Sequence, residues 1–490
     1  PDQKNMIDEG QITIRNAGSL VIQRGLHMVG SFLFAVLVPR LLGPSDYGRF
    51  ALVTSLYFWF VIVSDLGLTQ VMTRHVPYFR LQGEKEKLQK FFGNLLMVSL
   101  VSGALCACFY LLFTGLWLTD LDLFLLITLT VTLFIHSGNH PFFLLFLGLN
   151  QAGRWGMGEV FRHWLFLIFL LIGFYLNGLR GVLVGLFLTE VVVLAIGAYW
   201  GKNYFSRKEL RLDINYLTPY LRFGLMYFIS TLLSSISQHS GEVLVRLFYP
   251  DYVQVGYFGL AHTLYTTILS ASYQFIIAFT PFMITLQAQG NIKALRQWIE
   301  RLINWLTAGG MFGVFGVLLL GKDLVPMVLG TAYQPVAINL LPLFSALWFQ
   351  ILNQVAILLT LVYNRPKIAL TSAGIRLVAV WCFGPFLVAG WGSLGGCLTI
   401  LLAMAISAGY LTWRMQGVMT YSLRKWAWTI GLGFLFLPLL WFKSSWLING
   451  LLYGVFAIGY CALLFLFRLI TRSEIMSVWR ILRKQGEIIH

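Results

Sequence analysis

Apolar residues gather in long runs along this chain, and short polar segments separate the runs. Most runs approach the roughly 20 residues that an α-helix needs to cross the hydrocarbon core of a membrane. We therefore expect an all-α polytopic membrane protein with about 14 transmembrane helices. The predicted helices span residues 13–42, 47–74, 91–114, 122–148, 158–176, 180–200, 218–248, 254–284, 295–320, 338–362, 367–389, 393–414, 425–442 and 447–470.

The composition argues against a soluble protein. Of the 490 residues, 58% are hydrophobic and 11% are charged, whereas soluble domains carry about 25% charged residues. The loops left between the predicted helices are too short to form a large catalytic domain. The five cysteines lie in apolar runs and form no C-x-x-C pair, so we expect small apolar side chains rather than a disulfide framework or a metal site. The first apolar run is long for a signal peptide, and we expect it to be retained as a helix.

Basic residues are distributed unequally between alternate loops. If the N-terminus is cytoplasmic, 27 of the 35 Lys and Arg residues fall in the cytoplasmic loops and at the two ends, six fall on the other side, and Arg24 and Arg376 lie inside helices. Retention of positive charge in the cytoplasm therefore predicts that both termini are cytoplasmic, in the cell (inner) membrane. The same asymmetry explains the net charge of +16 without nucleic acid, because basic loops face anionic lipid headgroups.

An internal repeat predicts two lobes. Arg40-Leu41-x-x-Pro44 recurs as Arg246-Leu247-x-x-Pro250, and Gly48-x-Phe50-x-Leu52 recurs as Gly256-x-Phe258-x-Leu260. Both copies fall between the first and second helices of a set of six, an arrangement that transporters share. The predicted parts are a cytoplasmic segment (1–12), an N-lobe (13–200), a cytoplasmic linker (201–217), a C-lobe (218–414), two further helices (425–470) and a basic cytoplasmic tail (471–490).

Several titratable residues fall inside predicted helices, where charge is tolerated if it faces water or a substrate. Arg24 lies near the bilayer centre with His27 one turn further on, and His239, Glu242 and Arg246 share one stripe of a helix. For each of them a structural role stays open, either a charge pair that holds helices together or a side chain that reaches the headgroups. The candidate binding residues are Arg24, His27, Arg376, His239, Arg246 and Arg40, and the candidate ion-coupling residues are Asp65, Glu190 and Glu242.

Motifs for common enzymes are absent from the sequence. There is no G-x-x-x-x-G-K-[ST] phosphate loop, no H-E-x-x-H and no G-x-S-x-G. His136 and His140 have a spacing that suits zinc, but no carboxylate is nearby in sequence, so we expect no metal or cofactor. Asp120-x-Asp122 is a carboxylate pair that could serve glycosyl transfer, yet its loop is short and no domain is available to hold an acceptor. We expect that the chain is not an enzyme.

Three segments resemble a known family. The stretches Leu41–Gly48 (LLGPSDYG), Ser64–Leu68 (SDLGL) with Arg74, and Pro326–Val336 (PMVLGTAYQPV) resemble oligosaccharide flippases of the Wzx type. These belong to the multidrug/oligosaccharidyl-lipid/polysaccharide superfamily, which also contains lipid II flippases and MATE exporters. The resemblance implies alternating access between two six-helix lobes and a polyprenyl-pyrophosphate-linked oligosaccharide as substrate. It also implies a pyrophosphate contact at Arg24 and a groove for the lipid tail along residues 425–470.

Membrane lipids and a polysaccharide polymerase or other assembly proteins are the partners that this reading implies. Two other functions stay open at the level of sequence. A MATE-like cation or drug antiporter would use Asp65 and Glu190 to cycle protons or sodium. A membrane glycosyltransferase or polymerase would need catalytic carboxylates in the short outer loops. The sequence leaves energy coupling open between the membrane potential and a counter-ion.

Overall fold

The computed structural model describes the backbone of residues 2–149, 151–278, 283, 286, 287, 289–363 and 365–471. Within these ranges it describes the side chains of Gln23 and of residues 25 onward, apart from 81, 152, 207, 223, 226, 227, 271, 274, 275, 277, 278, 361 and 417–422. The Arg24 side chain therefore lies outside the described part.

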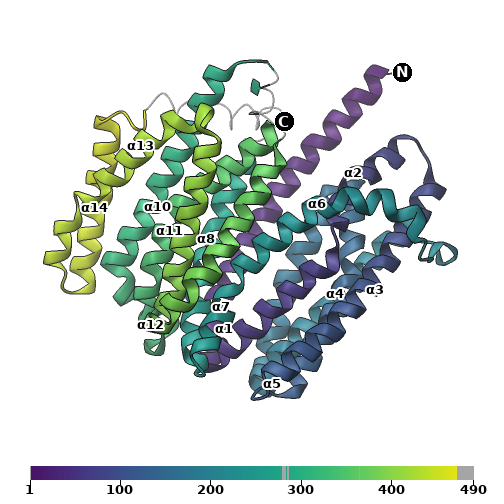
Figure 1. The fold of residues 1–490 in the computed structure, drawn as a ribbon, viewed down its shortest axis with the longest axis horizontal. Coiled ribbons are helices and arrows are strands. Elements are labelled where there is room, and N and C mark those ends of the chain that lie inside the picture. The colour runs from purple at the N-terminus through teal and green to yellow at the C-terminus, as the bar shows by residue number, and fades with distance from the viewer. Residues whose placement is uncertain are drawn as a thin grey trace. The chain divides into compact units, whose positions relative to one another are not determined.

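Helices make up nearly all of the described chain, and no strand occurs in it (Figure 1). Short 3-10 turns cover Lys202–Tyr204, Arg207–Glu209, Thr331–Tyr333 and Leu437–Phe442. The α-helices are α1 (Asp2–Asp65), α2 (Leu68–Leu81), α3 (Lys85–Trp117), α4 (Leu123–Gly148), α5 (Ala152–Gly201), α6 (Ile214–Gln238), α7 (Ser240–Phe248), α8 (Tyr252–Ala278), α10 (Ile292–Leu329), α11 (Val336–Val362), α12 (Pro366–Arg414), α13 (Gln416–Phe434) and α14 (Trp446–Leu466).

Three long helices each contain two of the segments expected from sequence. Non-helical backbone divides α1 at Gly43 (φ 74°), α5 at Asn177 and Gly178, and α12 at Gly392 (φ 55°). These positive φ values favour glycine, which has no Cβ to clash. Among the described residues, nine continuous helices are long and apolar enough to cross a membrane. The expected fold class, an all-α polytopic membrane protein, is confirmed.

Two expected helices are interrupted. The segment 47–74 breaks at Leu66 and Gly67, both at positive φ, so that α2 begins at Leu68. The segment 218–248 breaks at His239, where α6 ends and α7 begins. The second break follows a serine-rich stretch, and serine side chains compete for backbone hydrogen bonds inside helices. His239, Glu242 and Arg246 therefore do not share one continuous helix.

Polar side chains cap the start of several helices. The Asp122 carboxylate accepts a hydrogen bond from the Phe124 amide (3.1 Å) ahead of α4. Asp213 caps α6 and Asn291 caps α10 in the same way. Such caps satisfy amide groups that a helix cannot pair internally, and they favour the start of these three helices at the observed residues.

The chain forms two compact units. Unit 1 contains the first part of α1, as far as Phe34, and Arg49–His239. Unit 2 contains Ala35–Gly48 and the described residues from Ser240 to Thr471. The six-helix lobes predicted from sequence divide the chain elsewhere, at residues 200 and 218, and they stay a prediction.

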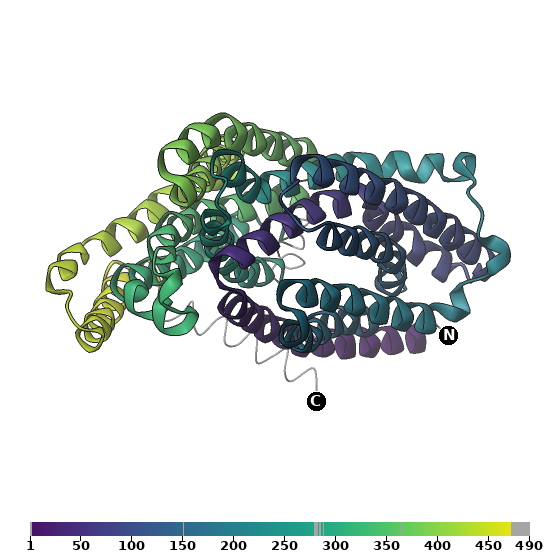
Figure 2. The same cartoon turned by 90° about the horizontal axis from the view of Figure 1, so that it is seen from below.

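In unit 1, the helices α3, α4 and α5 lie side by side in both views (Figures 1 and 2). Helix α2 packs on α4 and on α6. A Cβ added to Gly67 would lie 2.6 Å from the Gly224 carbonyl oxygen, so α6 approaches the start of α2 backbone to backbone. The core beneath them is apolar and includes Phe91, Phe92 and Leu145, each fully buried.

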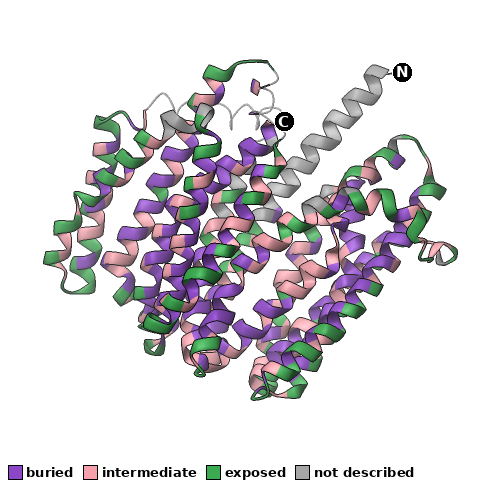
Figure 3. Ribbon diagram, viewed as in Figure 1, coloured by how far each residue is buried: buried purple, intermediate pink, exposed green. Residues whose placement is uncertain are grey.

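In unit 2, the helices α8, α11 and α12 pack together with α7, and α10 packs on α11. Helices α13 and α14 both contact α10. Buried residues concentrate along α10 and α11, whereas α14 is exposed over most of its length (Figure 3). The exposed side chains of α14 include Trp446, Leu451 and Ile458. An apolar exposed surface of this kind suits contact with lipid chains.

Candidate functional site

Polar side chains gather inside unit 1, on the faces of α4 and α5 that meet. The first turns of α5 carry Glu159, Arg162 and His163 at i, i+3 and i+4, a spacing that places them on one face. The second half of α5 adds Glu190, and other members come from α1, α2 and α4. We name this set the unit 1 polar cluster, and it consists of His27, Asp65, Thr69, His136, Asn139, His140, Glu159, Arg162, His163 and Glu190.

Arg162 lies between two carboxylates. Its Nε is 3.0 Å from Glu190 Oε1, and its Nη1 donates to Glu159 Oε1 at 2.7 Å. Its Nη2 donates to Asn139 Oδ1 (3.2 Å), and the Asn139 amide in turn donates to Glu190. Glu190 is 2% exposed and Asn139 is fully buried. A buried carboxylate is tolerated when it is paired and hydrogen-bonded, and these contacts supply both conditions for Glu190.

Two histidines of α4 face the acids of the cluster. His136 Nδ1 lies 3.3 Å from Glu190 Oε1, and His140 Nε2 lies 3.2 Å from Asp65 Oδ1. The two imidazole rings stack with centroids 5.9 Å apart. Thr69 Oγ1 donates to Asp65 Oδ1 (3.1 Å) and lies 3.2 Å from His140 Nε2. Each of these two carboxylates therefore has an imidazole as its immediate neighbour.

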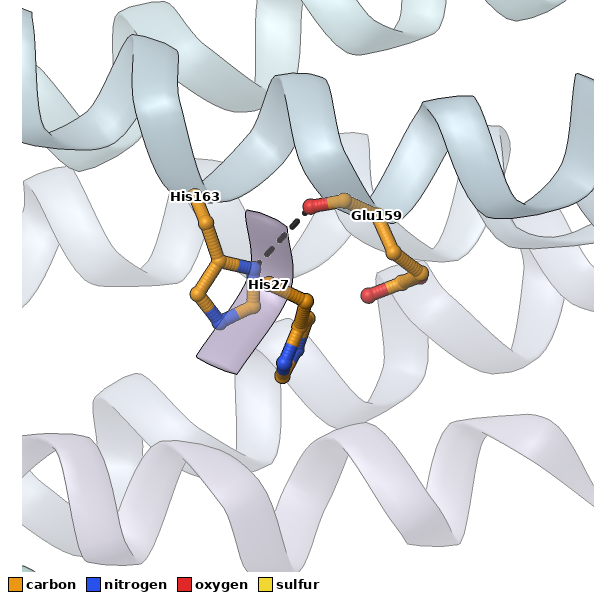
Figure 4. Close-up of side chains that lie close together, drawn as sticks. All are labelled: His27, Glu159 and His163. Carbon is orange, nitrogen blue, oxygen red and sulfur yellow. Dashed lines mark hydrogen bonds between the residues drawn. The ribbon is translucent and has the colours of Figure 1, made fainter. Parts of the chain in front are cut away.

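A third group of the cluster joins α1 to α5. His27 of α1 lies beside His163 of α5, with ring centroids 4.0 Å apart. The Glu159 carboxylate points toward the His27 ring (Figure 4). His163 Nδ1 donates to the backbone carbonyl of Glu159 (3.0 Å), and His27 Nδ1 lies 3.4 Å from Ser31 Oγ. All three side chains are partly exposed.

Unit 2 holds a separate buried pair. His262 Nδ1 lies 3.0 Å from Glu242 Oε1, and the two side chains are 6% and 5% exposed. Arg376, on α12, is 8% exposed and lies close enough to Tyr265 for an electrostatic interaction. These residues belong to α7, α8 and α12, which pack together.

One family model accounts for most of the chain. The model of polysaccharide biosynthesis proteins matches residues 13–287, which is more than half of the 490 residues. The chain belongs to this family. No curated protein matches its sequence.

Several solved structures share the fold of this family member. A MATE family multidrug resistance transporter of the MOP superfamily, inward-facing, is 17% identical with a TM-score of 0.69, and the match covers 81% of this chain and 98% of the transporter. The lipid II flippase MurJ, in an inward closed conformation, is 14% identical with a TM-score of 0.67, covering 92% and 100%. A MOP superfamily transporter from Pyrococcus furiosus is 16% identical with a TM-score of 0.55, covering 83% and 95%. The family member therefore has the MOP transporter fold.

The candidate residues from sequence are spread over both units of this polysaccharide biosynthesis protein. His27, Asp65 and Glu190 come together in the unit 1 polar cluster. His239, also in unit 1, stacks on Phe58 with ring centroids 5.0 Å apart. The prediction for Arg24 concerns a side chain outside the described part.

The remaining two candidates lie at helix ends in unit 2. Arg246 stands over the ring of Tyr252, 4.6 Å from its centroid. Arg40 is exposed, and its Nη1 donates to the Val328 carbonyl near the end of α10 (3.2 Å). Both arginines occupy the same position of the sequence repeat; Arg40 precedes the break in α1 at Gly43, and Arg246 precedes the end of α7.

Five members of the cluster are not identified from the sequence. Arg162 is counted there with the basic residues of a cytoplasmic loop, and Thr69, Asn139, Glu159 and His163 are not singled out. The available signal was the i, i+3, i+4 spacing of polar residues at the start of α5. That signal is weak because helix ends in membrane proteins commonly carry polar residues that face the headgroups.

The formal charges of the cluster do not cancel. Its members include three carboxylates, one arginine and four histidines. With the histidines counted as neutral, the formal charges sum to −2. Among these described side chains, acids therefore outnumber permanent cations. The arrangement suits proton or cation uptake as well as contact with an anion.

A small pocket lies outside the cluster, between the middle of α2 and the start of α6. It has a volume of about 440 Å³ and is lined by Arg74, His75, Tyr216, Pro219 and Tyr220. Burial and the neighbouring Arg74 guanidinium lower the pKa of His75. At neutral pH the permanent positive charge of this pocket therefore belongs to Arg74.

Proposed function

We propose that this protein moves a polyprenyl-pyrophosphate-linked oligosaccharide from the cytoplasmic to the outer leaflet of the inner membrane, by alternating access, for surface polysaccharide assembly. The observation that carries the proposal is membership in the polysaccharide biosynthesis family over residues 13–287. The shared fold with the lipid II flippase MurJ supports it. In this proposal both termini are cytoplasmic, the substrate leaves chemically unchanged, and a polymerase or another assembly protein receives it.

A pyrophosphate that crosses hydrocarbon needs cationic partners in place of water, and arginine supplies paired donors. We assign this role first to Arg24, at mid-depth of the first helix, with His27 one turn on. Arg376, Arg246, Arg40 and His239 are further candidates for contact with the headgroup or the sugars. A membrane potential that is negative inside favours outward movement of the anion by about 2.3 kcal/mol per charge per 100 mV.

Ion coupling is assigned to three buried or partly buried acids. Glu190 faces His136, Asp65 faces His140, and Glu242 faces His262. An acid beside an imidazole can exchange a proton or accept a cation when its neighbour changes charge. Counter-ion exchange at these acids would reset the transporter after the substrate leaves.

A cation or drug antiporter is the second candidate function. It is favoured by the excess of carboxylates over arginine in the unit 1 polar cluster and by the shared fold with a MATE transporter. In that function, cations would cross the membrane and the lipid-linked oligosaccharide would not.

Reconstitution of the full chain in liposomes tests the proposal. The assay follows the leaflet and the mass of a lipid-linked oligosaccharide, together with efflux of a trapped cationic dye. We expect the lipid to change leaflet with its mass unaltered, and Arg24→Gln to slow this at least tenfold, because a charge-assisted hydrogen bond contributes about 1.5–3 kcal/mol. Arg180→Gln is the matched control, since Arg180 is half exposed and pairs only with Asp122 at 2.5 Å among the ion pairs of the described residues.

Three results would overturn the proposal or part of it. Dye efflux without lipid movement would establish the antiporter instead. A product of changed mass would establish a glycosyltransferase or polymerase. Lipid movement that Arg24→Gln and Arg180→Gln leave equally fast would remove Arg24 from the pyrophosphate site.

A further inference from the structure

His27, Glu159 and His163 bring three metal-binding groups to one point of unit 1. One donor atom from each lies within 4.8 Å of the other two. Among the described residues, this is the one place where three side chains of His, Cys, Asp or Glu meet so closely. His27 comes from α1, whereas Glu159 and His163 stand one turn apart on α5 (Figure 4).

We propose that these three side chains bind a divalent transition metal ion of the zinc class. Two imidazoles and one carboxylate form a ligand set that zinc accepts, with a fourth position left for a water molecule. Donor atoms around tetrahedral zinc stand about 3.3–3.6 Å apart when the bonds are about 2.0–2.2 Å. The donor atoms lie within 4.8 Å of one another, so the side chains would have to rotate toward one another to bind the ion.

Hydrogen bonds from neighbouring groups orient the three side chains that would bind the ion. A carbonyl oxygen only accepts, so His163 Nδ1 is the donor to Glu159 O (3.0 Å), and the lone pair of the neutral ring is on Nε2. Ser31 Oγ lies 3.4 Å from His27 Nδ1 and can orient that ring in the same way. Arg162 Nη1 holds Glu159 Oε1 at 2.7 Å, which leaves Oε2 for the ion. Metal-binding histidines and carboxylates commonly have such outer partners.

Charge also favours a cation at this place. Glu159 and Glu190 share the single guanidinium of Arg162, so the three groups together carry one negative charge. A bound cation would offset that charge within a partly buried site. Because its ligands come from α1 and α5, the ion would link these two helices within unit 1.

The His136 and His140 pair does not compete for this assignment. Their spacing also suits zinc, and both have a carboxylate neighbour. The two imidazole rings stack on each other, and each ring contacts a different carboxylate. Thr69 also lies beside His140. The donor atoms of this pair therefore do not converge with a third ligand, whereas those around His27 do.

Titration of the purified full chain with Zn²⁺ tests the site. The protein is stripped with a chelator, freed of any affinity tag and kept in detergent without lipid substrate. We expect one Zn²⁺ per chain, and an affinity at least about tenfold lower in His27→Ala, Glu159→Gln and His163→Ala. Ser31→Ala should weaken binding less than these three. His75→Ala, which removes a histidine elsewhere in unit 1, should bind Zn²⁺ like the wild type.

Binding of Co²⁺ provides a second measurement, which does not require the alanine variants to fold. The visible absorption of the bound Co²⁺ should report a four-coordinate site, and Glu159→Gln, nearly the same size, should alter it. Zn²⁺ affinity that is unchanged in His27→Ala and Glu159→Gln would overturn the assignment, as would the absence of binding by folded wild-type protein. The binding assay contains no substrate lipid, so its result is independent of the proposed transport function.

Discussion

At the scale of single residues, Arg162 balances the charge inside unit 1. It is the only arginine in contact with Glu159 and Glu190 among the described residues, and its removal would leave two carboxylates facing each other. Breaking a buried ion pair from one side costs about 3–5 kcal/mol because a charge stays uncompensated. The stability that one member of the cluster contributes thus depends on the charge of the others. The effects of substituting its members on the free energy of unfolding should therefore not be additive.

A double-mutant cycle measures that dependence. We expect Arg162→Met to lower the free energy of unfolding by about 3–5 kcal/mol, and Arg162→Met with Glu190→Gln to recover part of the loss because one acid has been neutralised. Thermal unfolding in detergent is the measurement. Arg154→Met is the matched control, since Arg154 is exposed and contacts Gln151 at 2.9 Å. Additive effects of the two substitutions would contradict the described geometry.

The sequence identified some site residues and not others for a physical reason. Glu190 and Asp65 interrupt apolar runs, so the energetic cost of a charge in the membrane makes them visible. Glu159, Arg162 and His163 lie at the start of a helix, where polar residues are ordinary. Their importance comes from their packing against α4, and hydropathy along one helix carries no information about that partner.

At the scale of elements, the sequence located nearly every helix because membrane thickness sets their length. The breaks inside α5 and α12 fall close to the expected gaps at residues 177–179 and 390–392. The break at His239 was missed because the serine-rich stretch before it is also compatible with a continuous helix that lines a cavity or packs closely on a neighbour. The chain is closely packed just after the break, where a Cβ added to Gly241 would lie 2.0 Å from the Phe258 ring.

Matching positions of the sequence repeat lie against each other in unit 2. A Cβ added to Gly48 would lie 1.9 Å from the Tyr252 carbonyl oxygen, and one added to Gly256 would lie 2.0 Å from the Pro44 carbonyl oxygen. The glycines of the two repeat copies thus permit α1 and α8 to touch through their backbones. The glycines of the repeat therefore have a direct packing role, although the sequence similarity between the two copies is weak.

Substitution at this contact should be costly. We expect Gly48→Ala to lower the free energy of unfolding by about 1–3 kcal/mol, because the backbone has to shift to make room. Gly409→Ala is the control, since it lies within α12 and nothing is within 4 Å of its added Cβ. That change should be neutral or stabilising. Equal unfolding temperatures for Gly48→Ala and the wild type would show that the close approach is absent.

At the scale of the whole molecule, charge asymmetry predicted topology without any structural information. Basic residues orient a membrane protein because the loops that carry them stay in the cytoplasm. Their distribution over the loops can therefore be determined from the sequence alone. The partition of α1 between two compact units was not readable, because it depends on which helices its two halves contact. The arrangement of the cluster was hidden for the same reason.

Single-cysteine labelling tests the predicted topology. In a variant without the five native cysteines, all of which are free, we expect Asn203→Cys to react only with a reagent applied from the cytoplasmic side. Thr119→Cys, in the loop before α4, should react only from the opposite side. Both positions are exposed, so both should react once the membrane is dissolved. Labelling of the two positions from the same side would contradict the proposed orientation.

The most direct test of the proposed activity is the leaflet distribution of a lipid-linked oligosaccharide in sealed vesicles that contain only this protein. A probe that binds the sugar and cannot cross the membrane is added outside. We expect the pool of the inner leaflet to become accessible over time with its chemical structure intact, whereas vesicles without protein should keep that pool protected. If folded protein leaves the inner pool as protected as it is in empty vesicles, under an imposed membrane potential and under ion gradients alike, the proposed flippase activity is contradicted.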